Sequence, residues 1–399
     1  MKNQKVKYSI IIPVYNSIKY LPTCIESIII QDFESYEIIV SDDNSSDGTD
    51  LYLKTLNHPK VRVVRPERRL SMAEHFEWAL QHARGDWLMF VGGDDGLQSY
   101  FFSLAEKLTE LAIRKNIRTI MSERAYFFWP GCESLYGNVA VSYTGVDSVR
   151  TLSCGWQSLF ALLGFQTYFE LPQMYTTSLF ARSIVEEALQ KQGGNLFSTV
   201  PADANLGAIA CSLESRYVKS LVPLGWIGTS PGGVLITMES VSQDKVEPTD
   251  YIGYHPFSGD FALRSCSIYY WNALIRTSSL RKSFINYILL SKLFRTLMFA
   301  AVLAEIKISY KIDGKARMVF FNEAIRVNKC NESLVKGLSK VFPILYKTAK
   351  VKDIIYLKIL KTFNPAHTKI IYWTEEPAIN LVDASKKVKN NLTAFKLIK

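Results

Sequence analysis

The chain has 399 residues, of which 48% are hydrophobic and 21% are charged, and its formal net charge is +10. This composition indicates a globular protein that can bury a sizeable core, and it argues against a disordered chain. The positive charge suits anionic partners such as nucleotides, nucleic acid or an acidic membrane surface, and composition does not choose among them.

The cysteines and the apolar runs bear on where the protein works. The cysteines lie at positions 24, 132, 154, 211, 266 and 330 with no CxxC pair, which argues against a zinc ribbon or a dense disulfide framework and favours a reducing compartment. The N-terminal run is a poor signal peptide. The best membrane candidate, "FINYILLSKLFRTLMFAAVLAEI", contains Lys292 and Arg295. We expect a helix lying on the protein or on a membrane surface.

Strand-like and helix-like patterns alternate through the first 125 residues. Continuous apolar runs predict buried parallel strands at "YSIIIP", "YEIIV", "VRVV", "WLMFV" and "RTIMS". Between them, apolar residues share one face at helical spacing: Ile18, Leu21, Ile25, Ile28 and Ile29, then Met72, Phe76, Ala79, Leu80 and Ala83, then Leu104, Leu108 and Leu111. The order β-α-β-α-β-α-β-α-β predicts an α/β fold with a mostly parallel central sheet flanked by helices.

The pattern loosens beyond residue 126. Helical spacing returns over residues 183–190 and near Asp203, and residues 229–260 have the composition of a boundary. We expect one domain over 1–230, with halves 1–125 and 126–230, and a helical, basic region over 231–399.

Polar groups follow three of the predicted strands, where ligands of such sheets bind. Pro13 and Tyr15 follow the first strand and Asp42 and Asp43 the second, and a ring beside a carboxylate suits a nucleobase. The alternative for Tyr15 is a packing role. The alternative for the acidic run "SDDNSSDGTD" is turn or helix capping, which for Asp47 and Thr49 is weighed equally with a binding role.

The fourth predicted strand, "WLMFV", ends in "FVGGDDGL", which contains Asp94 and Asp95. Adjacent carboxylates suit Mg²⁺ or Mn²⁺ completed by substrate phosphates, and the glycines allow a diphosphate to approach. Neighbouring residues of a strand point to opposite sides, so one of the two should coordinate directly. A strand-ending turn is the alternative.

Basic residues and histidines offer further candidates. Arg68 and Arg69, together with Arg65, precede a predicted helix and suit either phosphate binding or a solvated charged turn. None of the five histidines has a convincing partner, and His75 and His82 are expected at the surface.

These residues resemble those of the family 2 inverting glycosyltransferases of the GT-A fold. The similarity covers about residues 8–110, through "YSIIIPVYNSIKYLPTCIESIIIQDFESYEIIVSDDNSSDGT" and "RRLSMAEHFEWALQHARGDWLMFVGGDDGL". It continues more weakly through "LPQMYTTSLFAR", "GGNLFSTVPADANLGAIA" and "LVPLGWIGTSPGG", which resemble bacterial enzymes of capsule, exopolysaccharide and O-antigen synthesis.

The resemblance implies roles for particular residues. Pro13 and Tyr15 would hold the uracil or thymine ring of a sugar nucleotide, and Asp43 would pair with the edge of that base. Asp94 falls on the last carboxylate of the family's Asp-x-Asp motif, the direct metal ligand. This chain departs from the motif because Gly92 replaces its first Asp and Gly93 occupies its middle position. Asp95 is the candidate to compensate.

An inverting transfer also needs a general base that deprotonates the acceptor hydroxyl. In the resembling family a carboxylate after the first half of the domain has this role, and Asp203 in "STVPADANLG" lies at the matching place. A helix N-cap or loop position is its alternative. Tyr126, Trp129 and Trp156 are candidates for stacking on acceptor sugars.

The expected function is transfer of a sugar from a UDP or dTDP sugar to a hydroxyl of a growing, lipid-linked bacterial surface glycan. The basic C-terminal region would hold a cytoplasmic enzyme at the inner face of the membrane, with a plain helical subdomain or an oligomer interface as alternatives. The rival is a module of the same fold that binds nucleotide sugars without turnover. A nucleic-acid binder is disfavoured because no interleaved aromatic and basic motif is present.

Overall fold

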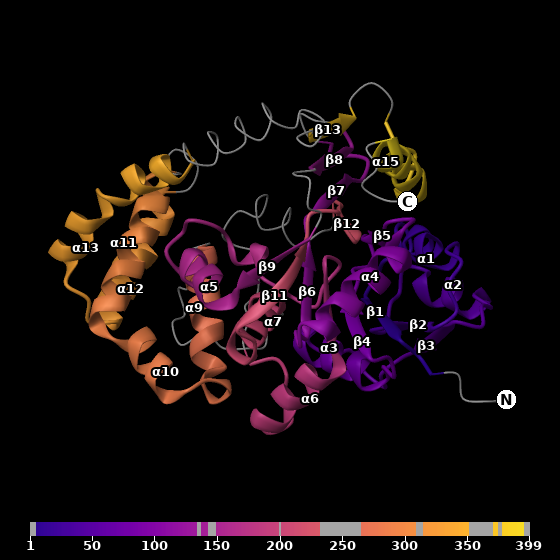
Figure 1. The fold of residues 1–399 in the computed structure, drawn as a ribbon, viewed down its shortest axis with the longest axis horizontal. Coiled ribbons are helices and arrows are strands. Elements are labelled where there is room, and N and C mark those ends of the chain that lie inside the picture. The colour runs from indigo at the N-terminus through magenta and orange to yellow at the C-terminus, as the bar shows by residue number, and fades with distance from the viewer. Residues whose placement is uncertain are drawn as a thin grey trace.

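The computed structural model describes residues 5–133, 137–142, 149–198, 201–231, 265–308, 314–350, 370–373 and 377–394. Figure 1 shows an α/β part that carries the N-terminus and a group of helices beside it, with a small second sheet above. The C-terminal helix of the described chain returns to the α/β part.

The central sheet has eight strands in the order β3-β2-β1-β4-β10-β6-β11-β9. Their bounds are β1 Tyr8–Val14, β2 Tyr36–Asp42, β3 Val61–Val64, β4 Trp87–Phe90, β6 Thr119–Ser122, β9 Val149–Ser153, β10 Ser178–Ala181 and β11 Arg216–Ser220. The first four strands pair in parallel. Strand β10 then inserts between β4 and β6 and runs antiparallel to both. The carboxyl ends of β1, β2 and β4 therefore meet at one edge, where the candidate site residues lie.

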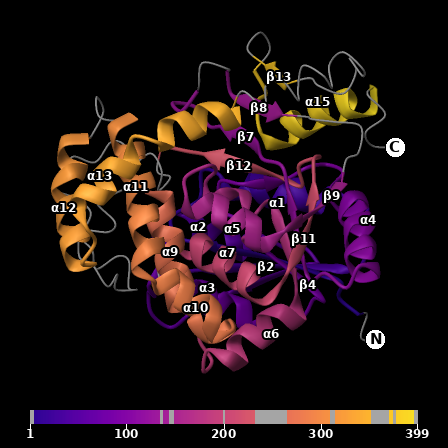
Figure 2. The ribbon, with the colours of Figure 1, turned by 60° about the vertical axis from the view of Figure 1, so that its left-hand side comes forward.

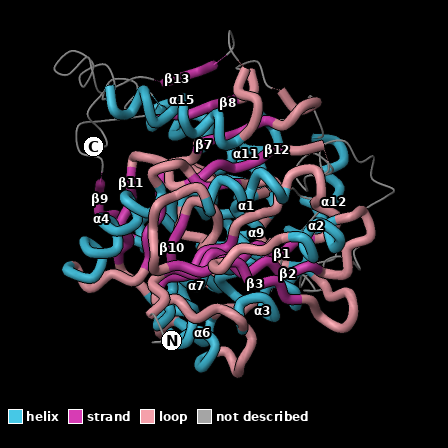
Figure 3. The backbone as a smooth tube through the Cα atoms, turned by 90° about the vertical axis from the view of Figure 1, so that its right-hand side faces the viewer, coloured by secondary structure: helices cyan, strands magenta, loops and turns pink. Residues whose placement is uncertain are grey.

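Strands β1, β2 and β4 are mostly apolar because successive side chains face two different helical layers. Ile10 and Ile12 of β1 pack into one core, whereas Ile11 between them packs into the other. The first core also takes helices α1 and α4, and the second takes α3, α6 and α7. Their bounds are α1 Leu21–Ile29, α3 Met72–Gln81, α4 Phe101–Arg114, α6 Arg182–Lys191 and α7 Ala202–Leu213. The shorter helix α2 spans Thr49–Thr55, and Figure 3 shows helices on both sides of the strands.

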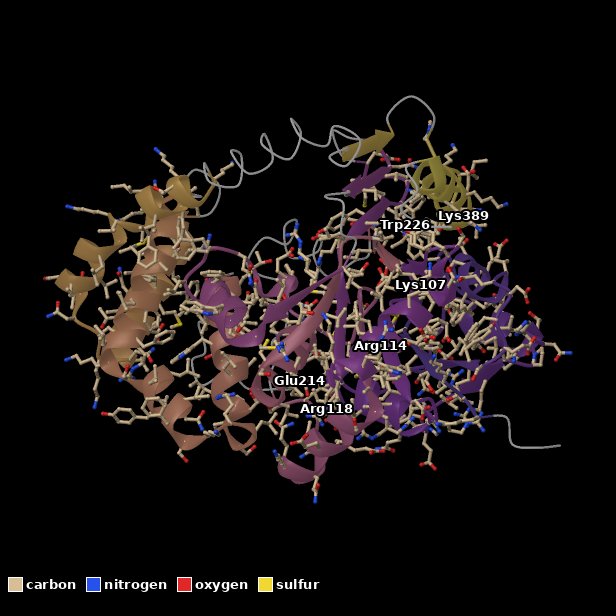
Figure 4. The ribbon with its side chains drawn as sticks, viewed as in Figure 1. Lys107, Arg114, Arg118, Glu214, Trp226 and Lys389 are labelled. Carbon is tan, nitrogen blue, oxygen red and sulfur yellow. The ribbon has the colours of Figure 1, made fainter. Side chains whose placement is uncertain are left out.

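A second sheet joins segments that are far apart in sequence, in the order β13-β8-β7-β12-β5. Its strands are β5 Gly96–Leu97, β7 Ala125–Phe128, β8 Val139–Ser142, β12 Gly225–Thr229 and β13 Ile370–Trp373. Helix α15 (Leu381–Ala394) packs beside it through Leu381, Ala384 and Val388 of the first core. The indole nitrogen of buried Trp226 donates to the Ser385 hydroxyl at 2.6 Å, and Figure 4 labels Trp226 close to α15.

A third core joins the α/β part to the helices that follow it. Helix α5 (Cys154–Leu162), the 3₁₀ turn η1 (Tyr168–Glu170) and α7 contribute to it from the α/β part. The other side comprises α9 Cys266–Arg276, α10 Ser283–Leu290, α11 Lys292–Ile308, α12 Lys315–Val327 and α13 Glu332–Ser339. The 3₁₀ turn η4 (Ser278–Leu280) follows α9 and places Leu280 in the second core. Figure 2 shows this helical group against one side of the molecule.

The apolar segment that contains Lys292 and Arg295 forms two helices, α10 and α11, which meet at a bend of 55°. Within the described ranges, no single helix is long and apolar enough to cross a membrane, although this bent pair passes the same test of length and composition. Nine residues of α11 are buried, which places most of that helix inside the protein.

The predicted fold class is confirmed: the chain has an α/β sheet flanked by helices and a helical C-terminal region. Three details differ from the sequence analysis. Strand β10 is antiparallel, β3 is a half-buried edge strand, and His75 is buried, with a ring nitrogen 2.6 Å from the Ser41 hydroxyl. The predicted boundary over 229–260 lies almost wholly outside the described residues. We retain the domain limits as a prediction, with the observation that β13 and α15 pack on the N-terminal part.

Candidate functional site

The loops after β1 and β2 are tied together and form the first part of the site. Asn16 has a φ of 51°, a left-handed conformation that asparagine tolerates better than most residues. Its backbone N–H donates to the Ser45 hydroxyl, and its side-chain oxygen accepts from Ser46. Asp47 accepts from the backbone of Ile18 and from Thr49. Asp47 is therefore a structural tie and turn cap, the alternative weighed for it.

Asp42 is the last residue of β2 and Asp43 the first residue of the loop after it, and the two have different partners. Asp42 is buried, with Oδ2 3.1 Å from Arg65 and Oδ1 accepting from the Ser45 backbone. Asp43 receives the Leu70 N–H on Oδ1. The structure thus places Asp42 in the framework and leaves Asp43 as the better candidate for the edge of a base.

Tyr15, Asp43 and Arg69 come together at this strand end. Tyr15 is 39% exposed, and the Arg69 guanidinium carbon lies 3.8 Å from the centroid of its ring, a cation–π contact. Pro13 is buried within β1 directly before this loop. Arg68 is separate: its exposed guanidinium lies 3.8 Å from Glu74 in the first turn of α3. The stacking pair is therefore Tyr15 and Arg69, and Arg68 belongs to a charged turn.

Asp95 is engaged by the protein itself. Its Oδ2 accepts from the Thr176 hydroxyl and the Gly92 N–H, and its Oδ1 accepts from the Gly228 N–H at 2.7 Å. Burial first, and the Asp94 charge second, raise its pKa to about 7. Asp95 was expected as a metal ligand, but both of its oxygens hold loops in place, so we assign it a structural role.

Asp94 has the more open carboxylate. The Ser230 hydroxyl donates to its Oδ2 at 2.6 Å, and the Trp129 indole donates to its backbone carbonyl at 2.8 Å. Burial raises the pKa of Asp94, as expected for a carboxylate with no cationic partner among the described residues. Among the described residues, no three His, Cys, Asp or Glu side chains gather to hold a metal ion. A site of one carboxylate plus substrate phosphates remains compatible with Mg²⁺.

Tyr175 is a site residue that the sequence analysis missed. A Cβ atom added to Gly92 would lie 2.6 Å from the Tyr175 hydroxyl, so this hydroxyl fills the space next to the missing motif carboxylate. Asp94, Asp95 and Asp203 all interact electrostatically with Tyr175, whose pKa burial raises well above its usual value. Met174, with a φ of 50°, precedes it in a strained conformation of the kind that accumulates at functional sites. The one sequence signal was the pair of glycines, whose vacant space must be filled by another side chain.

Asp203 lies in the first turn of α7. Its Oδ1 accepts from the Tyr168 hydroxyl at 3.2 Å and from the Ala204 N–H. Burial raises its pKa, whereas the Ala204 N–H, Arg124 and Tyr168 oppose that effect. A carboxylate poised in this way suits a general base. The alternative weighed for Asp203, a helix N-cap or loop position, differs from its place in the structure, because Pro201 is the N-cap of α7 and Asp203 lies inside the first turn.

The three acceptor candidates have different surroundings. Trp129 is 7% exposed and packs on Tyr20 with ring centroids 4.8 Å apart, so it supports Asp94 and presents no open face to a sugar. Tyr126 is partly buried and stacks on Phe128 at 6.2 Å. Trp156 on α5 is 62% exposed beside Phe160, and it remains the open aromatic surface of the three.

Residues 9–111 match the family model of glycosyl transferase family 2. The chain therefore carries a glycosyl transferase family 2 domain, and the family predicted from the motifs is confirmed.

Relatives and solved structures extend this comparison. The chain is 27% identical over 130 residues to the glycosyltransferase GlyG of Streptococcus pneumoniae, which covers 30% of this chain and 42% of GlyG. It is 35% identical over 108 residues to the GalNAc(5)-diNAcBac-PP-undecaprenol beta-1,3-glucosyltransferase of Campylobacter jejuni, which covers 26% and 35%. The S. aureus TarS fragment 1–349 with UDP-GlcNAc superposes with a TM-score of 0.49 and 18% identity, over 93% of this chain and 98% of that one. The chain spans less than half the length of these two curated relatives.

Proposed function

We propose that this protein is an inverting glycosyltransferase that moves a sugar from a UDP or dTDP sugar to a hydroxyl of a bacterial surface glycan. The observation that carries the proposal is the grouping at the strand ends of a stacking aromatic, a base-edge carboxylate, a metal-compatible carboxylate and a buried carboxylate. Tyr15, Asp43 and Asp94 follow strands that neighbour one another in the parallel part of the sheet, and Tyr175 interacts electrostatically with both Asp94 and Asp203.

The proposed chemistry assigns one task to each group. Tyr15 stacks on the base with Arg69 beside it, and Asp43 accepts a hydrogen bond from the edge of the base. Asp94 would hold Mg²⁺ or Mn²⁺, which offsets charge on the leaving diphosphate when bound. Asp203 takes the proton of the acceptor hydroxyl as that oxygen attacks the anomeric carbon.

The acceptor side rests on different support. The Campylobacter relative is named for a substrate linked to undecaprenol diphosphate, and we propose a lipid-linked acceptor for this chain too. Trp156 is then a stacking surface for acceptor sugars. The basic C-terminal region would keep the enzyme at the cytoplasmic face of the membrane where such acceptors lie.

The deciding experiment is a calorimetric titration of UDP, and separately dTDP, into the whole protein with Mn²⁺ and with EDTA. We expect binding that strengthens with Mn²⁺, and we expect Asp94→Ala to remove the metal-dependent part. Asp50→Ala is the matched control, because Asp50 pairs with Lys54 on α2. UDP or dTDP binding that changes neither with Mn²⁺ nor with Asp94→Ala would contradict the metal-binding role of Asp94.

Turnover separates the proposal from its rival. The same protein should release UDP or dTDP from a responding sugar nucleotide, and Asp203→Asn should abolish release while leaving nucleotide binding intact. Firm nucleotide binding with no release from any sugar nucleotide would instead support a binding module, for which the replacement of the motif Asp by Gly92 is the supporting observation.

A further inference from the structure

Helix α10 carries large apolar side chains on the side that faces away from the protein. Phe284 is 72% exposed, Tyr287 is 75% exposed and Leu293, just beyond the helix, is 69% exposed. Ile285, Ile288 and Leu290 complete this set of exposed side chains, which we call the α10 surface. A helix that faces water normally shows polar residues on its outer side, so these residues form an unusual apolar patch.

The inner side of α10 fixes the orientation of the helix. Leu289 is 7% exposed, and its backbone carbonyl accepts from the buried Trp271 indole. Asn286, the main polar residue of the helix, bonds to Arg281 and to the Ser278 carbonyl. These contacts direct the amide inward, so the apolar side chains are held outward.

The charged residues that flank α10 along the chain have one sign. From residue 265 to residue 304 the sequence contains no Asp or Glu. It contains Arg276, Arg281, Lys282, Lys292 and Arg295 over the same stretch. Lys282 lies directly before α10 and Lys292 begins α11 two residues after α10 ends, and both are exposed. An apolar surface between cations suits the boundary of an anionic bilayer, where acyl chains lie beneath phosphate groups.

We propose that the α10 surface docks this protein onto a membrane rich in anionic lipids. Phe284, Tyr287 and Ile288 enter the boundary between headgroups and acyl chains, while Lys282 and Lys292 contact lipid phosphates. Docking takes place from one side of the bilayer, since α11 turns away by 55° into the buried core. The biological role of this docking rests on the proposed lipid-linked acceptor. Membrane binding itself is measured without any sugar chemistry.

The test is co-sedimentation of the full chain with vesicles of mixed phosphatidylcholine and phosphatidylglycerol, and with vesicles of phosphatidylcholine alone. We expect binding to the anionic vesicles that weakens with added salt. Phe284→Gln combined with Tyr287→Gln should weaken it by about tenfold or more. Leu51→Gln combined with Ile113→Gln is the matched control, because both are 63% exposed on other helices and should have no effect.

A second measurement reports insertion directly. Tryptophan emission of Tyr287→Trp should be quenched by vesicles whose acyl chains carry bromine, whereas emission of Leu51→Trp should gain no such quenching. Equal vesicle binding by the Phe284/Tyr287 variant and the wild type would overturn the proposal. A wild-type dimer that the Phe284/Tyr287 substitutions dissociate in the absence of lipid would also overturn it, since the α10 surface would then join two copies of the chain. UDP binding should be the same in all variants, so failure of the docking is distinguished from failure of the proposed function.

Discussion

The neighbouring carboxylates of Asp94 and Asp95, just after β4, differ in the number of hydrogen bonds that they accept. Asp95 accepts from donors that lie 81 and 133 positions away in the chain, Thr176 and Gly228. Asp94 has Ser230 as the side-chain donor in the described part. Buried carboxylates with several donors stabilise loops, whereas a carboxylate with few donors can accept a cation. Asp95 therefore anchors loops, and Asp94 is the candidate metal ligand.

The space beside Gly92 gives a prediction that reverses a simple expectation. Restoring the motif carboxylate by Gly92→Asp should not improve metal-dependent UDP binding, because the new Cβ would lie 2.6 Å from the Tyr175 hydroxyl and 2.9 Å from Asp95. We expect the variant to lose about 1–3 kcal/mol of unfolding free energy from overpacking, measured by guanidinium denaturation.

Combining Gly92→Asp with Tyr175→Ala removes the hydroxyl from this space and should recover part of that loss. The effects of the two substitutions should therefore not add. Additive effects would show that Tyr175 does not limit this position.

Asp203 leads to a prediction about pH. A general base acts when ionised, and burial raises the pKa of Asp203 above its ordinary value. Activity should thus rise with pH through a limb that lies above the range of an exposed carboxyl group. Tyr168→Phe removes a hydrogen bond that favours the ionised form, so the limb of kcat/KM should move to still higher pH.

The matched control for this prediction is Tyr217→Phe. The Tyr217 side chain is also fully buried, but its hydroxyl donates to the Glu170 backbone carbonyl. Its pH limb should stay in place. A downward or absent shift in Tyr168→Phe would remove Asp203 from the role of base.

At the scale of elements, α15 shows how a distant segment completes a core. Leu381 is fully buried in the first core, whereas Ile379, two residues earlier, is 86% exposed. Leu381→Ala should lower the unfolding free energy by about 2–5 kcal/mol. Ile379→Ala should change it by less than about 0.5 kcal/mol. Equal effects in denaturant titrations would mean that α15 does not pack as described.

The elements also show where periodicity was sufficient. Strands β1, β2, β3, β4 and β6 and helices α1, α3, α4, α6 and α7 lie at the predicted places, because each has a strong local apolar pattern. The pattern did not reveal that β10 would run antiparallel between β4 and β6. Neither could it pair β13 with β8, since strand partners depend on contacts between distant segments.

At the scale of the whole molecule, three cores connect the N-terminal part to later segments. The third core spans α5 and α7 on one side and α9, α11, α12 and α13 on the other. We therefore expect a fragment of residues 1–231 to expose apolar surface of α7 and of buried Trp226. Compared with the full chain, it should unfold at lower denaturant concentration and bind a hydrophobic dye.

A chain that ends at residue 376 should fall between these two, since it lacks α15 alone among the described elements. A 1–231 fragment as stable as the full chain would show instead that the domain predicted over 1–230 folds independently.

The sequence by itself determined the alternation of strands and helices, the family and the strand ends where polar residues gather. These features are local, so a short stretch of the sequence is enough to identify each of them. The tertiary structure decided which of those polar residues are committed to the framework, because donors such as Thr176 and Gly228 come from remote segments. It also placed Tyr175 beside Gly92 and turned the apolar residues of α10 outward. Such contacts depend on how elements pack in space, and no short window of sequence contains them.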